Sequence, residues 1–229
     1  MTARQKTSVV IPVLNEQARI GQLLDALAGC DLERVVVDGG SEDDTIARVR
    51  AHGAECLVRS APGRGRQLDA GWRAASGDVV VLLHADTRLE PGWPQAVREA
   101  LRDPRVAGGA FRLRFDSPRM AFRVIEAGAW LRARLGGLPY GDQALFARRE
   151  LLERLGGVPH VPIFEDLDLA RALRRAGRLV LLSQRAWSSP RRYERGVVRA
   201  VLRNQLALAA WLVGLDRERV AHWYRGGGR

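Results

Sequence analysis

Cysteine and long apolar segments are scarce in this 229-residue chain, and each scarcity excludes a class of protein. The two cysteines, Cys30 and Cys56, are too few for a disulfide framework and lack a metal-type spacing, so both are predicted to be small buried residues. No run of 18 or more apolar residues occurs, which argues against a membrane-spanning helix. The first seven residues lack the apolar stretch of a signal peptide. We therefore expect a cytoplasmic protein, either free or peripheral on the inner face of the membrane.

Negative charge is scarce at one end of the chain only. The net charge is +11, and Lys6 is the only lysine beside 36 arginines. Residues 1–170 carry 23 basic and 23 acidic side chains, whereas residues 171–229 carry 14 basic and three acidic ones. A uniformly basic protein would indicate a nucleic-acid partner. A neutral body with a basic end does not, and we expect no nucleic-acid partner.

Hydropathy patterning in the first half of the chain predicts an α/β fold. Short runs rich in valine alternate with segments of helical periodicity. The expected strands are residues 8–13, 34–37, 55–58, 79–83 and 106–115, and the expected helices are residues 18–27, 45–51, 63–75 and 92–101. This alternation is typical of βαβ units, so we expect a mostly parallel central sheet with helices on both faces.

The pattern is less regular in the second half. Helices are expected at residues 120–135, 149–155, 167–176 and 197–213, with short strands at residues 143–147 and 179–182. We predict one domain over residues 1–190, followed by a basic, partly amphipathic helical extension over residues 191–229.

Acidic side chains follow two of the predicted strands. Asp38 comes directly after the second strand, and Asp86 follows the fourth with two residues between. Ligands of an open parallel sheet bind beyond the carboxyl ends of its strands, so the two carboxylates should share one edge. A turn-capping role explains either residue alone, whereas the pair favours a binding site. The glycine fingerprints of dinucleotide and P-loop sites are absent.

A second acidic group, Glu165-Asp166-Leu167-Asp168, lies at the head of a predicted helix. The helix dipole by itself favours acids in a first turn. Phe164 and Leu167 bracket these acids, however, which suggests partial burial. A partly buried carboxylate can serve as a general base.

Four segments, taken in order, resemble the family 2 glycosyltransferases of the GT-A fold. They are residues 8–16 (SVVIPVLNE), 36–45 (VVDGGSEDDT), 82–91 (LLHADTRLEP) and 164–169 (FEDLDL). The first is similar to the family's opening strand, the second to its nucleotide-contacting Asp motif, the third to its Asp-x-Asp position and the fourth to its catalytic Glu-Asp motif. Residues 63–67 and 140–143 further resemble the subgroup known as radical-SAM/selenodomain-associated transferases, a name that refers to gene neighbourhood.

The resemblance implies a site for a nucleotide-diphosphate sugar. Its implied donor-binding residues are Pro12, Val13, Glu16, Asp38, Arg66, His84, Asp142 and Gln143. Asp86 is implied to bind Mg²⁺ or Mn²⁺ together with diphosphate oxygens. Asp166, next to Glu165, is implied to be the catalytic base. His84 replaces the first Asp of Asp-x-Asp, and it either faces the ribose or is a poor ligand for a hard ion.

The implied reaction is a metal-dependent, inverting transfer of a single sugar to an unknown hydroxyl acceptor. The Gln-x-x-Arg-Trp motif of processive synthases is missing, and only residues 191–193 (RRY) lie in a similar place. One alternative is a nucleotidyltransferase-like enzyme on a related fold, although residues 14–19 (LNEQAR) lack the glycine-rich loop of that class. Another is a non-catalytic nucleotide-sugar-binding member, which His84 favours and the intact acids Asp86, Glu165 and Asp166 disfavour.

The basic end leaves two interpretations open. Residues 206–215 form an apolar stretch too short to cross a bilayer, and Trp211, Trp223 and Tyr224 are candidate interface anchors. Either this helix packs on the domain with arginines outward, or it lies on an anionic membrane surface. In the second case a lipid-linked acceptor becomes attractive. The sequence does not indicate an oligomeric state.

Overall fold

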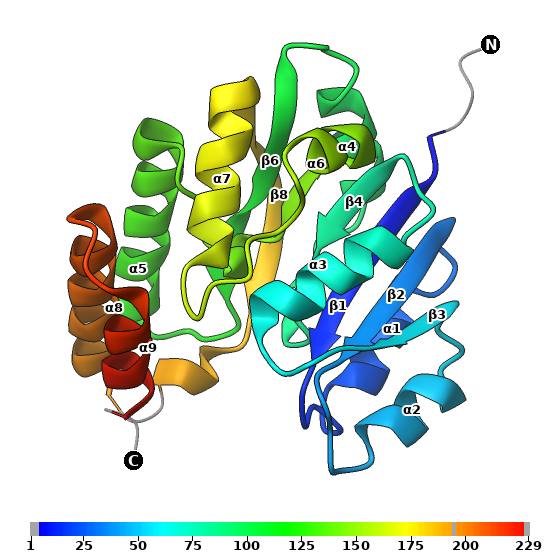
Figure 1. The fold of residues 1–229 in the computed structure, drawn as a ribbon, viewed down its shortest axis with the longest axis horizontal. Coiled ribbons are helices and arrows are strands. Elements are labelled where there is room, and N and C mark those ends of the chain that lie inside the picture. Colours follow the sequence, from blue (N-terminus) through cyan, green and yellow to red (C-terminus); the bar gives the residue numbers. More distant parts are fainter. Residues whose placement is uncertain (1–4, 194–195, 227–229) are drawn as a thin grey trace.

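The computed structural model describes residues 5–193 and 196–226, in which one eight-stranded sheet carries helices on both faces (Figure 1). The strands are β1 (Thr7–Val13), β2 (Leu32–Asp38), β3 (Cys56–Arg59), β4 (Val79–Leu82), β5 (Thr87–Leu89), β6 (Val106–Phe115), β7 (Leu145–Arg148) and β8 (Arg178–Ser188). The helices are α1 (Ile20–Leu27), α2 (Thr45–Ala51), α3 (Arg64–Ala74), α4 (Trp93–Ala100), α5 (Met120–Leu131), α6 (Arg149–Arg154), α7 (Glu165–Ala176), α8 (Val197–Leu212) and α9 (Arg217–Gly226). A π-helical turn (Arg132–Gly136) follows α5.

The strand order is β3-β2-β1-β4-β7-β6-β8-β5. Strands β1 to β4 are parallel, and so are β6 and β8, whereas β7 runs antiparallel to both of its neighbours and β5 runs antiparallel to β8. The predicted, mostly parallel sheet is therefore confirmed. Val13 pairs with Asp38 across β1 and β2, so these two strands end together at one edge of the sheet.

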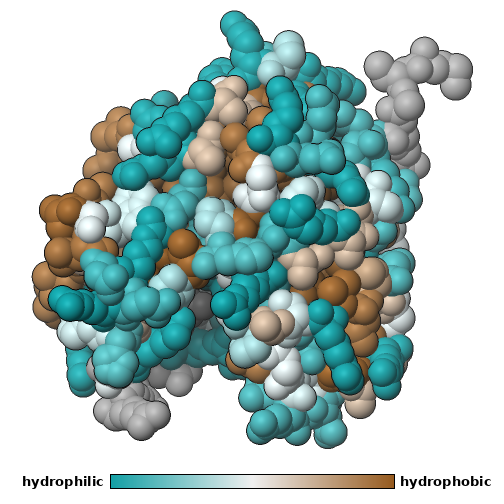
Figure 2. All heavy atoms as spheres, viewed as in Figure 1, coloured by the Kyte–Doolittle hydropathy of each residue, from teal (hydrophilic) through white to brown (hydrophobic). Residues whose placement is uncertain are grey.

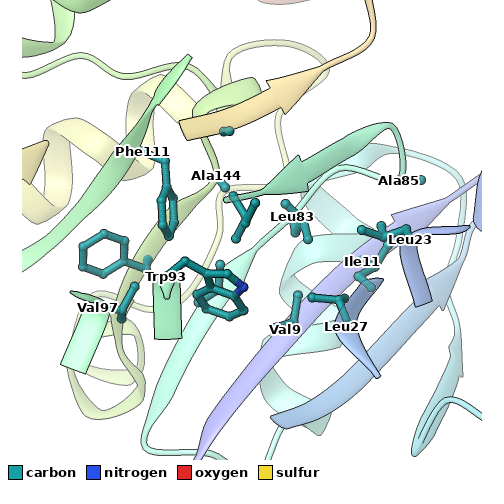
Figure 3. Close-up of a cluster of buried hydrophobic side chains, with 14 of the residues drawn as sticks. Val9, Ile11, Leu23, Leu27, Leu83, Ala85, Trp93, Val97, Phe111 and Ala144 are labelled. Atoms are coloured by element: carbon teal, nitrogen blue, oxygen red, sulfur yellow. The ribbon is translucent and has the colours of Figure 1, made fainter. Parts of the chain in front are cut away.

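Alternating side chains of the parallel strands build two separate cores. Val9 and Ile11 of β1 face the core under α1, α2 and α4, part of which Figure 3 shows. Val10 points to the opposite face and packs with Trp72 of α3 and with residues of α6 and α7. Because both faces of each strand are covered, these segments read as continuous apolar runs. The same double burial explains why they were recognisable in the sequence.

Some local expectations were wrong. Cys30 is exposed in the turn after α1, and Cys56 is half-buried because it opens an edge strand. β8 extends well beyond the expected 179–182 strand, and neither β5 nor α9 was expected.

The C-terminal helices pack against the body of the protein. Trp211 of α8 is buried rather than exposed as an anchor, and its Nε1 donates to Asp168 Oδ1 at 3.1 Å. Arg217 of α9 forms an ion pair with the same carboxylate. Within the described residues, no helix combines the length and the hydropathy needed to cross a membrane.

Candidate active site

The ends of β1 and β2 are joined by side-chain hydrogen bonds. Buried Gln67 of α3 donates from Nε2 to the carbonyls of Val13 and Val37, at 2.8 and 2.9 Å. Asp38 is also buried, and its Oδ1 accepts the Ser41 N–H at 2.9 Å, which closes the turn after β2. The Val13 side chain belongs to the core, while neighbouring Pro12 is half-buried. Asp38, one of the implied donor-binding residues at this edge, is therefore hydrogen-bonded within its own turn.

Arg191 joins Glu16 and Asp86, which are 70 residues apart in the sequence. Its two terminal nitrogens contact both oxygens of Glu16, at 2.6 and 3.0 Å. Its Nε lies 3.0 Å from Asp86 Oδ2. The hydrogen bonds to Glu16 raise the pKa of Arg191, in spite of partial burial and with help from Asp86. Glu16, an implied donor-binding residue, and Asp86, the implied metal ligand, therefore both pair with the Arg191 guanidinium.

A second arginine cluster lies at the start of α7. Arg64, the first residue of α3, contacts Glu165 through Nε and donates from Nη2 to Asp166 Oδ2 at 2.7 Å. Its Nη1 lies 2.9 Å from His84 Nε2. Since a guanidinium only donates, that imidazole nitrogen is the acceptor. His84 Nε2 is therefore engaged by Arg64 and faces the implied base rather than an isolated metal position.

Burial shapes the electrostatics of this second cluster. Both carboxylates are almost fully buried, with exposed side-chain fractions of 5% for Glu165 and 9% for Asp166. Burial raises the pKa of Glu165, Arg64 opposes this, and the neighbouring Asp166 carboxylate adds to the rise. Burial alone would lower the pKa of Arg64, but the two carboxylates outweigh it and raise that pKa. The arginine thus carries a full charge between two acids.

Asp166 is held by backbone as well as by Arg64. Its Oδ2 accepts the Gly141 N–H at 2.6 Å, and its Oδ1 accepts the Leu167 N–H at 2.8 Å. A Cβ at position 141 would lie within about 3 Å of Arg64, His84 and Asp166 at once. Only glycine therefore allows this close approach, which orients the carboxylate.

The implied residues Asp142 and Gln143 have different surroundings. Asp142 lines the pocket that also holds Asp166. Gln143 is fully buried beneath it, where its Nε2 donates to the Phe111 carbonyl at 3.1 Å and its Oε1 accepts from the Tyr140 N–H. Gln143 therefore supports the turn instead of facing the pocket.

The loop-to-helix segment at residues 63–67 contributes a different arginine from the implied one. Arg66 is exposed and does not line the pocket of Asp166, whereas Arg64 does. Sequence reasoning missed Arg64, although a signal existed. Arg64 lies three and four positions before the buried residues Gln67 and Leu68, so it shares their helix face. Arg191 was noted only for its place in the chain, and nothing local indicates its partners.

Two cavities lie on either side of the segment that follows β8. A pocket of about 530 Å³ holds Arg64, His84, Glu165 and Asp166. A cleft of about 290 Å³ holds Asp86. Ser188 and Ser189 line both. The structure therefore brings His84, Asp142, Glu165 and Asp166 together, and it places Glu16 and Asp86 together on the other side.

The donor set at Asp86 fits a divalent cation that is held mainly by substrate. The described residues contain no group of three or more His, Cys, Asp or Glu side chains able to hold a metal ion alone. Mg²⁺ is commonly bound by one or two protein carboxylates, while substrate phosphate oxygens and water complete its shell. The buried carboxylate of Asp86, which pairs with Arg191, can supply one such ligand. Hard carboxylate oxygen also suits Mn²⁺.

The fold and this acidic sheet edge together define a GT-A glycosyltransferase, the class of enzyme that moves a sugar from a nucleotide-sugar donor. The family model for Glycosyl transferase family 2 matches residues 8–156. The chain is also 31% identical to an uncharacterized glycosyltransferase of Mycobacterium tuberculosis, over 79% of this chain and 84% of the relative. The chain therefore belongs to glycosyl transferase family 2.

Solved structures agree with this assignment. Glucosyl-3-phosphoglycerate synthase from Mycobacterium tuberculosis, in complex with Mn²⁺ and UDP-glucose, is 26% identical with a TM-score of 0.57, and the match covers 79% of this chain and 70% of that one. TarS from S. aureus, in complex with UDP-GlcNAc, shares the fold with a TM-score of 0.63 at 20% identity. The match covers 80% of this chain and 58% of the TarS chain.

A further sequence relative is an undecaprenyl-phosphate 4-deoxy-4-formamido-L-arabinose transferase of Sodalis glossinidius. It is 33% identical over 62% of this chain and 48% of its own length.

Proposed function

We propose that the protein is a metal-dependent, inverting glycosyltransferase that moves one sugar from a nucleotide-diphosphate donor to a hydroxyl acceptor. The observation that carries this proposal is the position of Asp166. It lies in the first turn of α7, inside a pocket, and three donors hold its oxygens in place. A carboxylate fixed in this way is suited to accept a proton from an alcohol that enters the pocket. We assign the catalytic base to Asp166.

Glu165 acts beside the base rather than as the base. It is paired with Arg64 and buried, and burial raises its pKa. In this arrangement it positions the Arg64 guanidinium, which in turn contacts Asp166 and His84. Attack of the acceptor hydroxyl on the anomeric carbon, from the face opposite the leaving diphosphate, inverts that carbon. The hydroxyl proton passes to an Asp166 oxygen.

Donor binding is assigned to the edge formed by β1, β2 and the end of β4. Pro12, Val13, Glu16 and Asp38 provide its nucleotide side. Asp86 would hold Mg²⁺ or Mn²⁺ with the diphosphate, and the ion neutralises the leaving group when bound. Relatives in complex with Mn²⁺ or Mg²⁺ and UDP support a uridine nucleotide as the donor.

The donor assignment is tested by thermal shift with UDP in the presence and absence of Mn²⁺. We expect a Mn²⁺-dependent rise in the melting temperature of the wild type and its loss in Asp86→Ala. Asp116→Ala is the matched control, because Asp116 lines the same cleft but is exposed. A Mn²⁺-dependent shift that survives in Asp86→Ala would remove the metal role of Asp86.

The base assignment is tested by hydrolysis of UDP-glucose, with water as the acceptor. Asp166→Asn should lower turnover by about 10²–10⁴-fold while UDP binding persists. Asp168→Asn is the control, since Asp168 lies on the same helix but pairs with Arg217. NMR of the released sugar should show β-glucose from the α-linked donor. Release of α-glucose would contradict inversion, and full turnover in Asp166→Asn would contradict the base assignment.

A further inference from the structure

The outer faces of α5 and α8 leave an apolar surface beside the reaction pocket. Figure 2 shows hydrophobic side chains gathered over these two helices, at the left of the molecule. The large exposed apolar residues of α5, of the π-helical turn after it and of α8 are Met120, Val124, Leu131, Leu135, Val198, Leu202, Leu206 and Leu212. Contiguous apolar patches of this kind mark binding surfaces in soluble proteins. The surface is therefore a candidate binding surface.

Between α5 and α8 this surface is hollowed into a groove of about 790 Å³. Ile125 and Ala129 of α5 face Val201 and Leu202 of α8 across it. The volume lies in the range of small-molecule sites. An elongated apolar ligand thus has both the room and the chemical surroundings that it needs.

The groove joins the pocket that holds Asp166. Tyr140, Asp142, Tyr193 and Asn204 line both spaces. At this junction the Tyr140 hydroxyl is buried without a hydrogen-bond partner among the described residues, and so is Arg203 Nε in the wall of the reaction pocket. Since buried polar atoms in native proteins are nearly always paired, both atoms are available to bond a polar ligand group or water.

Three arginines and one acid, Asp142, lie around the same junction. The Arg132 guanidinium lies 3.5 Å from the centre of the Tyr140 ring, and that of Arg203 lies 4.7 Å from the Tyr224 ring. Arg225 also lines the reaction pocket. A polar or anionic head group therefore finds donors at the junction, while an attached apolar chain finds the groove.

We infer that the groove binds the apolar chain of the acceptor, so the acceptor is a lipid whose hydroxyl-bearing head enters the pocket at Asp166. This inference rests on the proposed function, because the head must present its hydroxyl to the base. A second copy of the chain would cover the apolar surface. It would not account for the shared lining of the groove and the pocket, or for the unpaired polar atoms between them.

The test uses hexyl, octyl and decyl β-glucosides as probes of the full-length protein, with calorimetric titration below their micelle concentrations. Affinity should rise with chain length, by up to about fourfold for each methylene that becomes fully buried. Gly128→Phe should abolish this rise, because a side chain at Gly128 meets no atom within 4 Å and projects into the groove. Ala127→Phe is the matched control, since Ala127 is the exposed neighbour that does not line the groove.

The shift caused by UDP and Mn²⁺ is measured on every variant, so that the two proposals can fail separately. Loss of the chain-length dependence in Gly128→Phe alone, with that shift unchanged, supports the groove. Affinities independent of chain length, or unchanged in Gly128→Phe, overturn it. Concentration-dependent dimerisation or vesicle binding without chain-length dependence also overturns it. Chain-length dependence without any shift from UDP would instead count against the proposed function. If Gly128→Phe does not fold, Leu202→Gln should weaken decyl glucoside binding by about fivefold, on the area that Leu202 contributes.

Discussion

Two arginines of this protein each bridge a pair of carboxylates, and the two clusters differ in where their acids come from in the sequence. Arg64 meets Glu165 and Asp166, which are adjacent in the sequence and belong to one helix turn. Arg191 meets Glu16 and Asp86, which follow two different strands. Burial does not separate them: the Arg64 side chain is 29% exposed and that of Arg191 is 31% exposed. Their acids are 5% and 9% exposed at Arg64, and 13% and 4% exposed at Arg191.

The clusters also differ in what else holds their acids. In the Arg64 cluster, the backbone N–H groups of Gly141 and Leu167 also hold the Asp166 carboxylate. The Arg191 cluster borders an open cleft, at the place assigned to a metal ion and diphosphate. A guanidinium on a connecting segment can there be exchanged for another cation. The Arg64 cluster therefore restrains the proposed base, and the Arg191 cluster lies at the proposed donor site.

The largest effect should come from removing Arg64. Arg64→Met leaves two buried carboxylates without their cation, which should lower the free energy of unfolding by about 3–5 kcal/mol. Urea denaturation, followed by tryptophan fluorescence, measures this. Arg66→Met, two residues further along α3 and exposed, should change stability by no more than about 0.5 kcal/mol. A loss below about 1 kcal/mol for Arg64→Met would show that the cluster is not buried in solution.

The next effect concerns the close approach at Gly141. Gly141→Ala places a methyl group against Arg64, His84 and Asp166, which should cost about 1–3 kcal/mol of stability and lower turnover. Thermal denaturation and UDP-glucose hydrolysis measure the two effects. Gly128→Ala adds a methyl group in open space on α5 and should be neutral or stabilising. Equal behaviour of the two variants would contradict the packing around Gly141.

A smaller effect should appear as a pH dependence. Because burial raises the pKa of Glu165, the folded state binds a proton more tightly than the unfolded state, whose pKa is near the ordinary 4.5. The stability contributed by that proton is present at low pH and is lost as pH rises through the folded pKa. The melting temperature of Glu165→Gln, measured relative to that of the wild type, should therefore rise as the pH increases from 4.5 to neutrality. A difference that does not change with pH would contradict the raised pKa.

The smallest stability effect is expected at Arg191. Arg191→Met should cost about 1 kcal/mol or less, because Arg191 and Glu16 are partly exposed and Asp86 lines an open cleft. Since Arg191 and Mn²⁺ both bind at Asp86, less Mn²⁺ should be needed for the UDP thermal shift in this variant. Arg185→Met, whose arginine pairs with Glu90, is the control. A requirement for more Mn²⁺ would show that Arg191 binds the diphosphate together with the metal.

Hydropathy and turn chemistry were enough to predict most of the architecture. The helix at residues 45–51 and the strand at residues 106–115 have the predicted bounds, because each is defined by a local pattern of apolar burial. The reversed direction of β7 and the existence of β5 were not predictable in this way. A strand's direction depends on the partner with which it pairs, and β5 is a three-residue edge strand that pairs with β8 about 100 residues away.

Within the site, the sequence by itself singled out the acids to which the chemistry is assigned in the proposal. Asp38 and Asp86 follow strands whose order brings side chains to one edge of a parallel sheet, and Asp166 lies in the first turn of a helix. Only the tertiary structure decided their partners. It selected Arg64 over Arg66, buried Gln143, and joined Glu16 to Asp86 through Arg191. The physical reason is that the burial of apolar residues follows from the local periodicity of the sequence. The partner of a charged side chain depends instead on contacts between segments that are far apart in the chain.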